Sequence, residues 1–294
     1  MRHFLLIPHL KIHNANAMSS PYTIGFPAMT AWLGAVHALQ RKLKQQGCDL
    51  NLNKVAVSCH DFNLQTYKGR GDFVHSIVGT ANPLDKDGNR PAFIEEARCH
   101  LEVSLLIEIE SSSKRQRDQL LELVNGTAAS MKFTSGDVLS AKPCTILNFD
   151  DDEDQSQQLR PILNKLMLGH VLIERRDLVI QSMQDGKDAL DSVLDYLKVT
   201  HSSIQDEDGK VTWTSKRKAQ GWLVPIAVGF QGISELGHAK NQRDVNTLHR
   251  FAESVLTLGE FVMPYRIESI DQLLWQYHVD LENNLYLCQN QNTH

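Results

Sequence analysis

The segment CHLEVSLLIEIE at positions 99–110 constrains the fold of this chain more than any other. Apolar and polar residues alternate along it, and in a β-strand successive side chains point to opposite faces. Leu101, Val103, Leu105, Ile107 and Ile109 then point one way, and His100, Glu102, Ser104, Glu108 and Glu110 the other. The pattern predicts a long, half-buried strand with one face on a core and the other in water or against a partner.

The rest of the first half predicts strands and helices around this one. Positions 3–12 and 54–67 have strand patterns, the second followed by a glycine-rich hairpin, and positions 130–149 offer further strand material. A helix with a buried face begins at Met29, and Ser113 with Gln116 forms a capping-box pattern for a helix that runs to about Val124. The order strand, helix, strand with hairpin, strand, helix, strand is typical of a ferredoxin-like or RRM-like sandwich. We therefore predict an α+β fold in which residues 1–149 form an RRM-like RNA-binding domain.

The second half begins at an acidic run, DDDED at positions 150–154, which is typical of an exposed boundary. Positions 159–168, 188–197 and 245–258 have helical patterns, and Ser269 with Gln272 predicts the start of a last helix before a terminal strand. Pro225 predicts that its segment is an edge strand, because proline cannot donate to a ladder. We expect residues 150–294 to be a mixed, largely helical half that packs on the first and faces partner subunits.

Composition limits the classes of function. The net charge of −5 argues against a free-standing nucleic-acid binder, but residues 1–149 carry +3 and residues 150–294 carry −8. The five cysteines are scattered and never form a CxxC pair, so we expect buried free thiols and neither disulfides nor a zinc site. No segment has the pattern of a membrane span or secretory signal, so we expect a cytoplasmic protein.

The candidate ligand-binding segment is the small, polar loop at positions 14–27, between the first strand and the first helix. Its amides and hydroxyls, on Asn14, Asn16, Ser19 and Ser20, and its rings, on Tyr22 and Phe26, are groups that bind unpaired RNA. The alternative is a structural crossover loop whose polar side chains form hydrogen bonds with the backbone of the loop itself.

Three basic side chains extend this candidate site. His37 and Arg41 lie one turn apart on the polar face of the predicted helix, so both can reach one phosphate, although a solvated face is the alternative. Arg98 lies at the start of the alternating strand and could present charge on an RRM-like sheet. Its alternative is an ion pair with a glutamate at position 95, 96 or 102.

Catalytic motifs are absent from the sequence. There is no P-loop, GxGxxG, HExxH or GxSxG pattern, and the carboxylates of the acidic half do not form a metal-ligand pattern, so no cofactor is predicted. One hydrolytic hypothesis remains, in which His13, Tyr22 and His37 form a proton-transfer set that cuts RNA without a metal. Single histidines on helices more often pack or donate hydrogen bonds.

Four longer segments carry a family resemblance: positions 14–43, 81–106 (ANPLDKDGNRPAFIEEARCHLEVSLL), 221–230 (GWLVPIAVGF) and 250–262 (RFAESVLTLGEFV). Together with LLWQYH at 273–278 they resemble the small second subunit, of the RAMP superfamily, of the type I-F CRISPR surveillance (Csy) complex. The span 150–218 does not carry the resemblance.

The resemblance implies a non-catalytic protein that joins the large subunit as a heterodimer and caps the 5′ handle of the CRISPR RNA (crRNA). It also implies contact with the adjacent backbone subunit and, through the whole complex, with target double-stranded DNA. We expect the handle to be bound by Asn14, Asn16, Ser19, Ser20, Tyr22, Phe26, His37, Arg41 and Arg98. The alternative within the same fold is a metal-independent endoribonuclease that processes repeat RNA.

Overall fold

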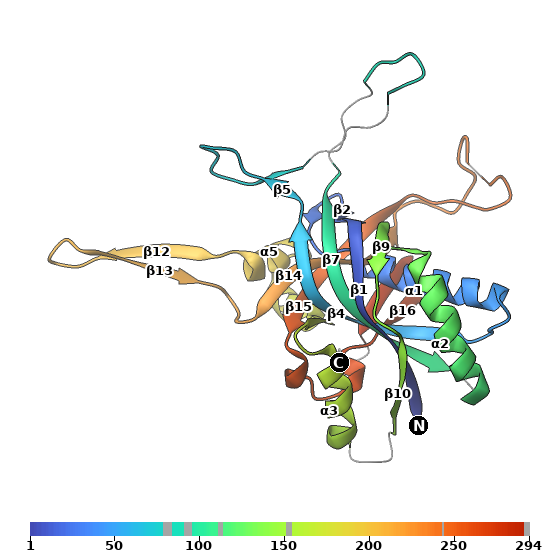
Figure 1. Ribbon diagram of the computed structural model, residues 1–294. Helices are drawn as coiled ribbons and strands as arrows, with labels where there is room; N and C mark the ends of the chain where they lie inside the picture. Colours follow the sequence, from blue (N-terminus) through green and yellow to red (C-terminus); the bar gives the residue numbers. More distant parts are fainter. Residues whose placement is uncertain (79–83, 91–95, 111–113, 151–154, 243, 291–294) are drawn as a thin grey trace.

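The computed structural model describes residues 1–78, 84–90, 96–110, 114–150, 155–242 and 244–290. Its centre is one sheet of eleven strands with antiparallel pairings (Figure 1). In spatial order the strands are β11 (His170–Glu174), β15 (Ala252–Val262), β14 (Trp222–Gly232), β17 (Leu285–Asn290), β16 (Trp275–Asp280), β4 (Asn51–Leu64), β7 (Arg98–Glu110), β1 (Arg2–Asn16), β9 (Gly136–Ser140) and β8 (Lys132–Phe133), and β10 (Thr145–Phe149) also pairs with β1. The α+β class predicted from the sequence is confirmed.

The sheet passes through both halves of the chain. β4, from the first half, lies between β7 and β16, and it also pairs with β11 through His170 and Val171. Because β11 pairs with β15 as well, the strands from β11 round to β4 form a closed ring. The division into domains at residue 150 stays a prediction.

Helices cover both faces of the sheet. α1 (Met29–Gln45) and α2 (Lys114–Ala129) pack on one face of β1, β4 and β7, and α3 (Gln155–Leu166) packs on the other with the 3-10 turns η1 (Pro264–Arg266) and η2 (Ile270–Gln272). α4 (Arg176–Gln184) and α5 (Ala189–Leu197) pack on β14 and β15. α3 and α5 confirm two of the predicted helices, whereas the capping box at Ser113 lies outside the described residues.

Short two-stranded ribbons stand apart from this sheet. They are β2 (Met18–Ser20) with β3 (Thr23–Ile24), β5 (Thr66–Tyr67) with β6 (Ser76–Ile77), and β12 (Thr200–Gln205) with β13 (Val211–Lys216). β5–β6 is the predicted hairpin, and it projects from the body of the molecule, as β12–β13 does (Figure 1).

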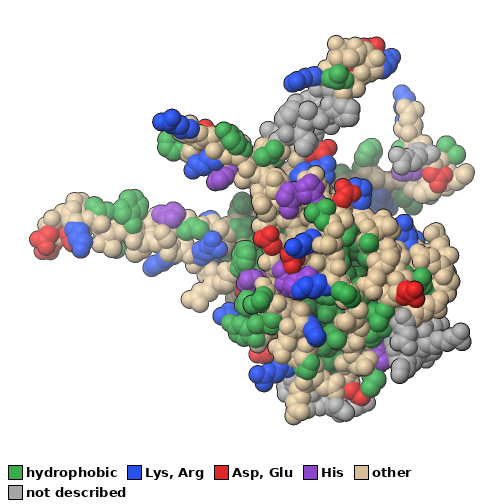
Figure 2. Space-filling model, in the orientation of Figure 1, with side chains coloured by type: hydrophobic (Ala, Val, Ile, Leu, Met, Phe, Trp, Pro, Cys, Tyr) green, Lys and Arg blue, Asp and Glu red, His purple; other side chains and the backbone are tan. Residues whose placement is uncertain are grey.

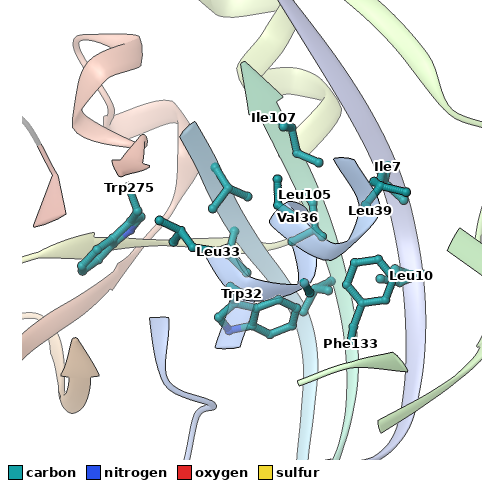
Figure 3. Close-up of a cluster of buried hydrophobic side chains, with 14 of the residues drawn as sticks. Ile7, Leu10, Trp32, Leu33, Val36, Leu39, Leu105, Ile107, Phe133 and Trp275 are labelled. Atoms are coloured by element: carbon teal, nitrogen blue, oxygen red, sulfur yellow. The ribbon is translucent and has the colours of Figure 1, made fainter. Parts of the chain in front are cut away.

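The alternation along β7 is confirmed by its burial. The five predicted inward residues are buried in one cluster with Trp32, Leu33, Val36 and Leu39 of α1 (Figure 3). Leu106, on the opposite face, belongs to a second cluster under α3. All five cysteines are buried and free, as predicted.

Two irregularities in β1 change which side chains face this core. Phe4 and Leu6 pack under α3, but after a register shift between Ile7 and Leu10 it is Leu10 and Ile12 that pack under α1. His9 lies in the shift with a φ of 51°. A β-bulge inserts a residue and re-aims the side chains that follow. Lys11 and His13 are therefore directed to the face opposite α1.

The predicted helix at positions 245–258 is wrong, because its second part lies in β15. β15 runs between β11 and β14 and buries Thr257, Leu258 and Gly259 in succession. The prediction followed the helical spacing of apolar residues at positions 248, 251, 252, 255 and 256, but pairing with β14 holds positions 252–258 as a strand, and tertiary contacts override such local spacing. The described part of the second half holds strands β11–β17 beside three α-helices, so it is mixed but not largely helical.

Two smaller predictions are corrected in part. The capping box of Ser269 and Gln272 is present, but it opens only the 3-10 turn η2. β14 is an internal strand, yet β17 pairs with it only at positions 229–231, so Pro225 has β15 as its sole neighbour among the strands described. No described strand pairs with Pro225 on the side away from β15, so its missing N–H costs no ladder bond there.

Candidate functional site

The polar side chains of the predicted binding loop are mostly used within the loop. The carboxamide of Asn16 donates to the Met18 carbonyl (3.2 Å) and accepts from the Met18 N–H (3.1 Å). The hydroxyls of Ser19 and Ser20 bond the Thr23 hydroxyl at 2.9 and 2.8 Å. These contacts correspond to the alternative given for this loop, in which side chains satisfy the local structure.

The two rings of the loop differ in access. Tyr22 is 68% exposed, whereas Phe26 is only 6% exposed and packs 5.7 Å from Trp32 and 5.2 Å from Phe261, measured between ring centroids. Asn14 has an exposed side chain and a left-handed φ of 56°. Tyr22 and Asn14 therefore remain accessible to a ligand, and Phe26 is mainly a core residue.

The three predicted basic residues lie on two different elements, two on α1 and one at the start of β7. His37 and Arg41 are exposed on the side of α1 that faces away from the sheet. Arg98 forms an ion pair with Glu96, which was the alternative for this residue. His13 is on the sheet face opposite α1, so the structure does not bring it together with His37 as a proton-transfer set.

The structure instead gathers histidines on the sheet face opposite α1. His9, Lys11 and His13 of β1, His60 of β4 and His100, Glu102 and Ser104 of β7 form what we call the histidine face, part of which Figure 2 shows. The rings of His9 and His60 stack with centroids 4.4 Å apart, and those of His13 and His100 at 4.2 Å.

Hydrogen bonds fix this face across three strands. The Ser104 hydroxyl accepts from the His9 N–H (3.1 Å) and lies 2.7 Å from Nε2 of His60, and so links β1 to β4. Nδ1 of His9 lies 2.6 Å from Glu102, whose other oxygen lies 3.5 Å from Lys11. The arrangement is a hydrogen-bonded polar surface of imidazole rings with the amine of Lys11 and the carboxylate of Glu102, against which a planar ligand can stack.

The electrostatics keep part of this face neutral. Burial and the neighbouring His9 lower the pKa of His60, and burial and the stacked His13 lower the pKa of His100. The Asn14 N–H donates to Nδ1 of His100 (3.1 Å), so that nitrogen acts as an acceptor. A protonated ring would donate from both nitrogens and lose this bond.

This lowered pKa predicts a pH dependence of stability. The unfolded chain protonates His100 near pH 6.5, the ordinary pKa, while the folded chain binds that proton only at lower pH. The free energy of unfolding is therefore expected to fall as the pH drops below about 6.5. His100→Asn keeps an acceptor for the Asn14 N–H but does not titrate, so denaturant unfolding of both proteins from pH 7 to pH 5 should show the smaller fall in the variant.

Taking the difference between the two proteins cancels the titrating groups that do not contact His100. One of these is Glu174, whose pKa burial raises to about 7 and which favours the folded state at acid pH. Equal falls in both proteins would contradict the assignment to His100.

The sequence held a signal for the histidine face that its interpretation missed. In HLKIH at positions 9–13, polar residues alternate with the inward Leu10 and Ile12 as they do in the alternating strand. His60 likewise ends the buried run of β4. What the sequence lacked was the register that brings β1, β7 and β4 side by side.

Within the described ranges, no group of three or more His, Cys, Asp or Glu side chains could hold a metal ion. Of the helices in those ranges, none combines the length and the apolar character needed to cross a membrane.

Comparison with known proteins gives two consistent matches. The family model described as "CRISPR-associated protein (Cas_Csy2)" matches residues 5–288. The protein named CRISPR-associated protein Csy2 from Pseudomonas aeruginosa (strain UCBPP-PA14) is 33% identical over an alignment 307 positions long, which covers 96% of this chain and 93% of that protein.

Proposed function

The chain belongs to the Csy2 family of CRISPR-associated proteins, and from this premise we propose that it is a non-catalytic, crRNA-binding subunit of a type I-F surveillance complex. In this proposal it forms a heterodimer with the large subunit, caps the 5′ handle of the crRNA and contacts the adjacent backbone subunit. Target DNA is then recognised by the whole complex through guide pairing.

The observation that carries RNA binding is the histidine face. Strands β4, β7, β1 and β10 lie in this order with α1 and α2 on one face, which supports an RRM-like unit. RRM domains bind unpaired RNA on the open face of such a sheet, where rings stack on bases. Here the part of that face that α3, η1 and η2 leave uncovered carries the stacked histidines, which offer ring surface, and the exposed amine of Lys11, which lies 3.5 Å from Glu102.

The proposed contacts outside this face are the exposed loop residues and the basic pair of α1. Asn14 lies in the last residues of β1, which ends at Asn16, and Tyr22 lies in the turn between β2 and β3 that follows, so a strand of RNA on the histidine face can continue onto them. His37, Arg41 and Arg98 stay predicted contacts. Because His37 and Arg41 lie on the outer side of α1, away from the sheet, they would bind a different stretch of RNA or a neighbouring subunit.

The test is co-expression of the full chain with the large subunit and a crRNA. We expect one co-purifying heterodimer with bound RNA and no cleavage of repeat RNA. In that heterodimer Arg41→Ala should weaken handle binding severalfold with a shallower salt dependence, because one phosphate contact is lost. Unchanged affinity and salt dependence in Arg41→Ala and Tyr22→Ala would favour a scaffold that touches only protein, and cleavage that is lost in His37→Ala would favour the endoribonuclease.

A further inference from the structure

A pocket of about 410 Å³ adjoins the histidine face, within the roughly 300–1,000 Å³ of ligand pockets. Its wall comes from the end of the binding loop, the outer end of β4, the start of β11 and the strands β14 and β15. The aromatic and apolar side chains that line it include Phe26, Phe62, His170, Trp222, Pro225 and Phe261. His60 belongs to both the pocket and the histidine face.

The rings of the pocket form one connected set. Trp222 lies 5.1 Å from Phe261 and 5.2 Å from His170, and Phe26 lies 6.2 Å from Phe62, measured between centroids. Trp222 and Phe62 are 52% and 37% exposed, whereas Phe26 and Phe261 are buried. An incoming group therefore meets the indole of Trp222 and the ring of Phe62, with the buried rings behind them.

The polar groups at this pocket suit the edge of a planar ring. Asp61 is exposed and offers carboxylate oxygens, and His170 offers a ring nitrogen, so donors and acceptors lie beside the aromatic surface. The thiol of Cys59 also lines the pocket, but burial raises its pKa to about 12, so it is not a reactive group.

We propose that this pocket takes one unpaired nucleobase of the bound RNA, stacked on Trp222. The inference rests on the proposed RNA-binding function and adds a base subsite to it. The strand of RNA follows the histidine face with its phosphates near Lys11, and at His60 one base turns out of the strand into the pocket. Aromatic stacking of splayed bases is the usual way in which proteins hold unpaired RNA.

The test compares Trp222→Ala with Trp213→Ala, which removes a tryptophan from outside the pocket. Trp213 of β13 is 69% exposed and lies on the projecting β12–β13 ribbon, outside the pocket. The full chain, co-purified with its co-expressed large subunit, is titrated with a single-stranded RNA of the handle sequence and with a series in which one position at a time lacks its base.

We expect Trp222→Ala to weaken binding of the intact RNA about tenfold, with the salt dependence unchanged because no charge is removed. Trp213→Ala should leave the affinity unchanged, and Trp222→Phe should recover most of it. One RNA of the series, which lacks the base that enters the pocket, should bind the wild-type protein more weakly by a similar factor. For that RNA, Trp222→Ala should cause no further loss of affinity.

The outcomes separate the subsite from the function. Suppose that the wild-type protein binds intact RNA, but that Trp222→Ala changes the affinity by the same factor for every RNA that lacks one base. The base subsite is then overturned, while the proposed RNA binding stands. If Trp222→Ala instead reduces co-purification of the large subunit, the pocket holds a protein side chain and the inference is overturned. If the wild type does not bind the RNA at all, the proposed function fails.

Discussion

Trp275→Ala is expected to lower the free energy of unfolding by about 3–5 kcal/mol, the range for removing a large aromatic side chain from a core. Trp275 is fully buried, and its indole N–H donates to the Leu172 carbonyl of β11 at 2.9 Å. It also forms the pairing with Val55 that joins β16 to β4. The substitution therefore leaves a cavity and removes a hydrogen bond where the ring of strands closes.

Denaturant unfolding measures this loss, and Trp213→Ala is its control. Trp213 is exposed on β13, so its replacement should change the free energy of unfolding by no more than about 0.5 kcal/mol. Trp275→Phe keeps most of the ring but loses the hydrogen bond, so an intermediate loss of about 1–3 kcal/mol is expected if the alanine variant does not fold. A loss below about 1 kcal/mol in Trp275→Ala would show that the indole side chain of Trp275 is not essential to the fold.

Removing two lysines from the edge of the histidine face is expected to weaken binding of single-stranded RNA at least tenfold at low salt. Lys11 lies on that face, and Lys142 is exposed and near enough to His60 to lower its pKa. Each phosphate contact to single-stranded nucleic acid contributes about 0.7 to the slope of log affinity against log salt. Lys11→Ala with Lys142→Ala should therefore reduce that slope by about 1.4.

The matched control removes the same charge elsewhere. Lys187 and Lys198 form ion pairs with Asp195 beside α5, away from the histidine face. Lys187→Ala with Lys198→Ala changes the net charge equally but should leave the slope unchanged, because neither side chain lies on the proposed path of the RNA. Equal losses in both double variants, measured over a series of salt concentrations, would mean that only the overall charge matters.

Several elements could be predicted from the sequence because their causes are local. The alternation of β7 and the apolar spacing of α1 each specify a buried face without reference to the rest of the chain. The helix α5 begins after Asp188, whose carboxylate accepts from the Asp191 N–H, so its start was also encoded locally. Arg98 was correctly given an ion pair as its alternative, because Glu96 is only two residues away.

The errors arose where tertiary contacts override local pattern. The segment at 245–258 has apolar residues at helical spacing, but β14 pairs with its second part, from position 252 on, as a strand, and β11 pairs with the same strand beyond it at positions 259–262. Phe26 was predicted to be a ring available for stacking, yet contact with Trp32 and Phe261 buries it.

The sequence alone determined the class of fold, the buried faces of its clearest strand and helix, and the family of the chain. Only the tertiary structure decided which histidines meet. His13 and His100, whose rings stack, are separated by most of the first half of the chain, and each bulge in β1 reverses the face to which the following side chains point. A one-residue change of register sends every following side chain to the other face of a sheet. The histidine face and its aromatic pocket therefore depend on strand pairing, which no local pattern specifies.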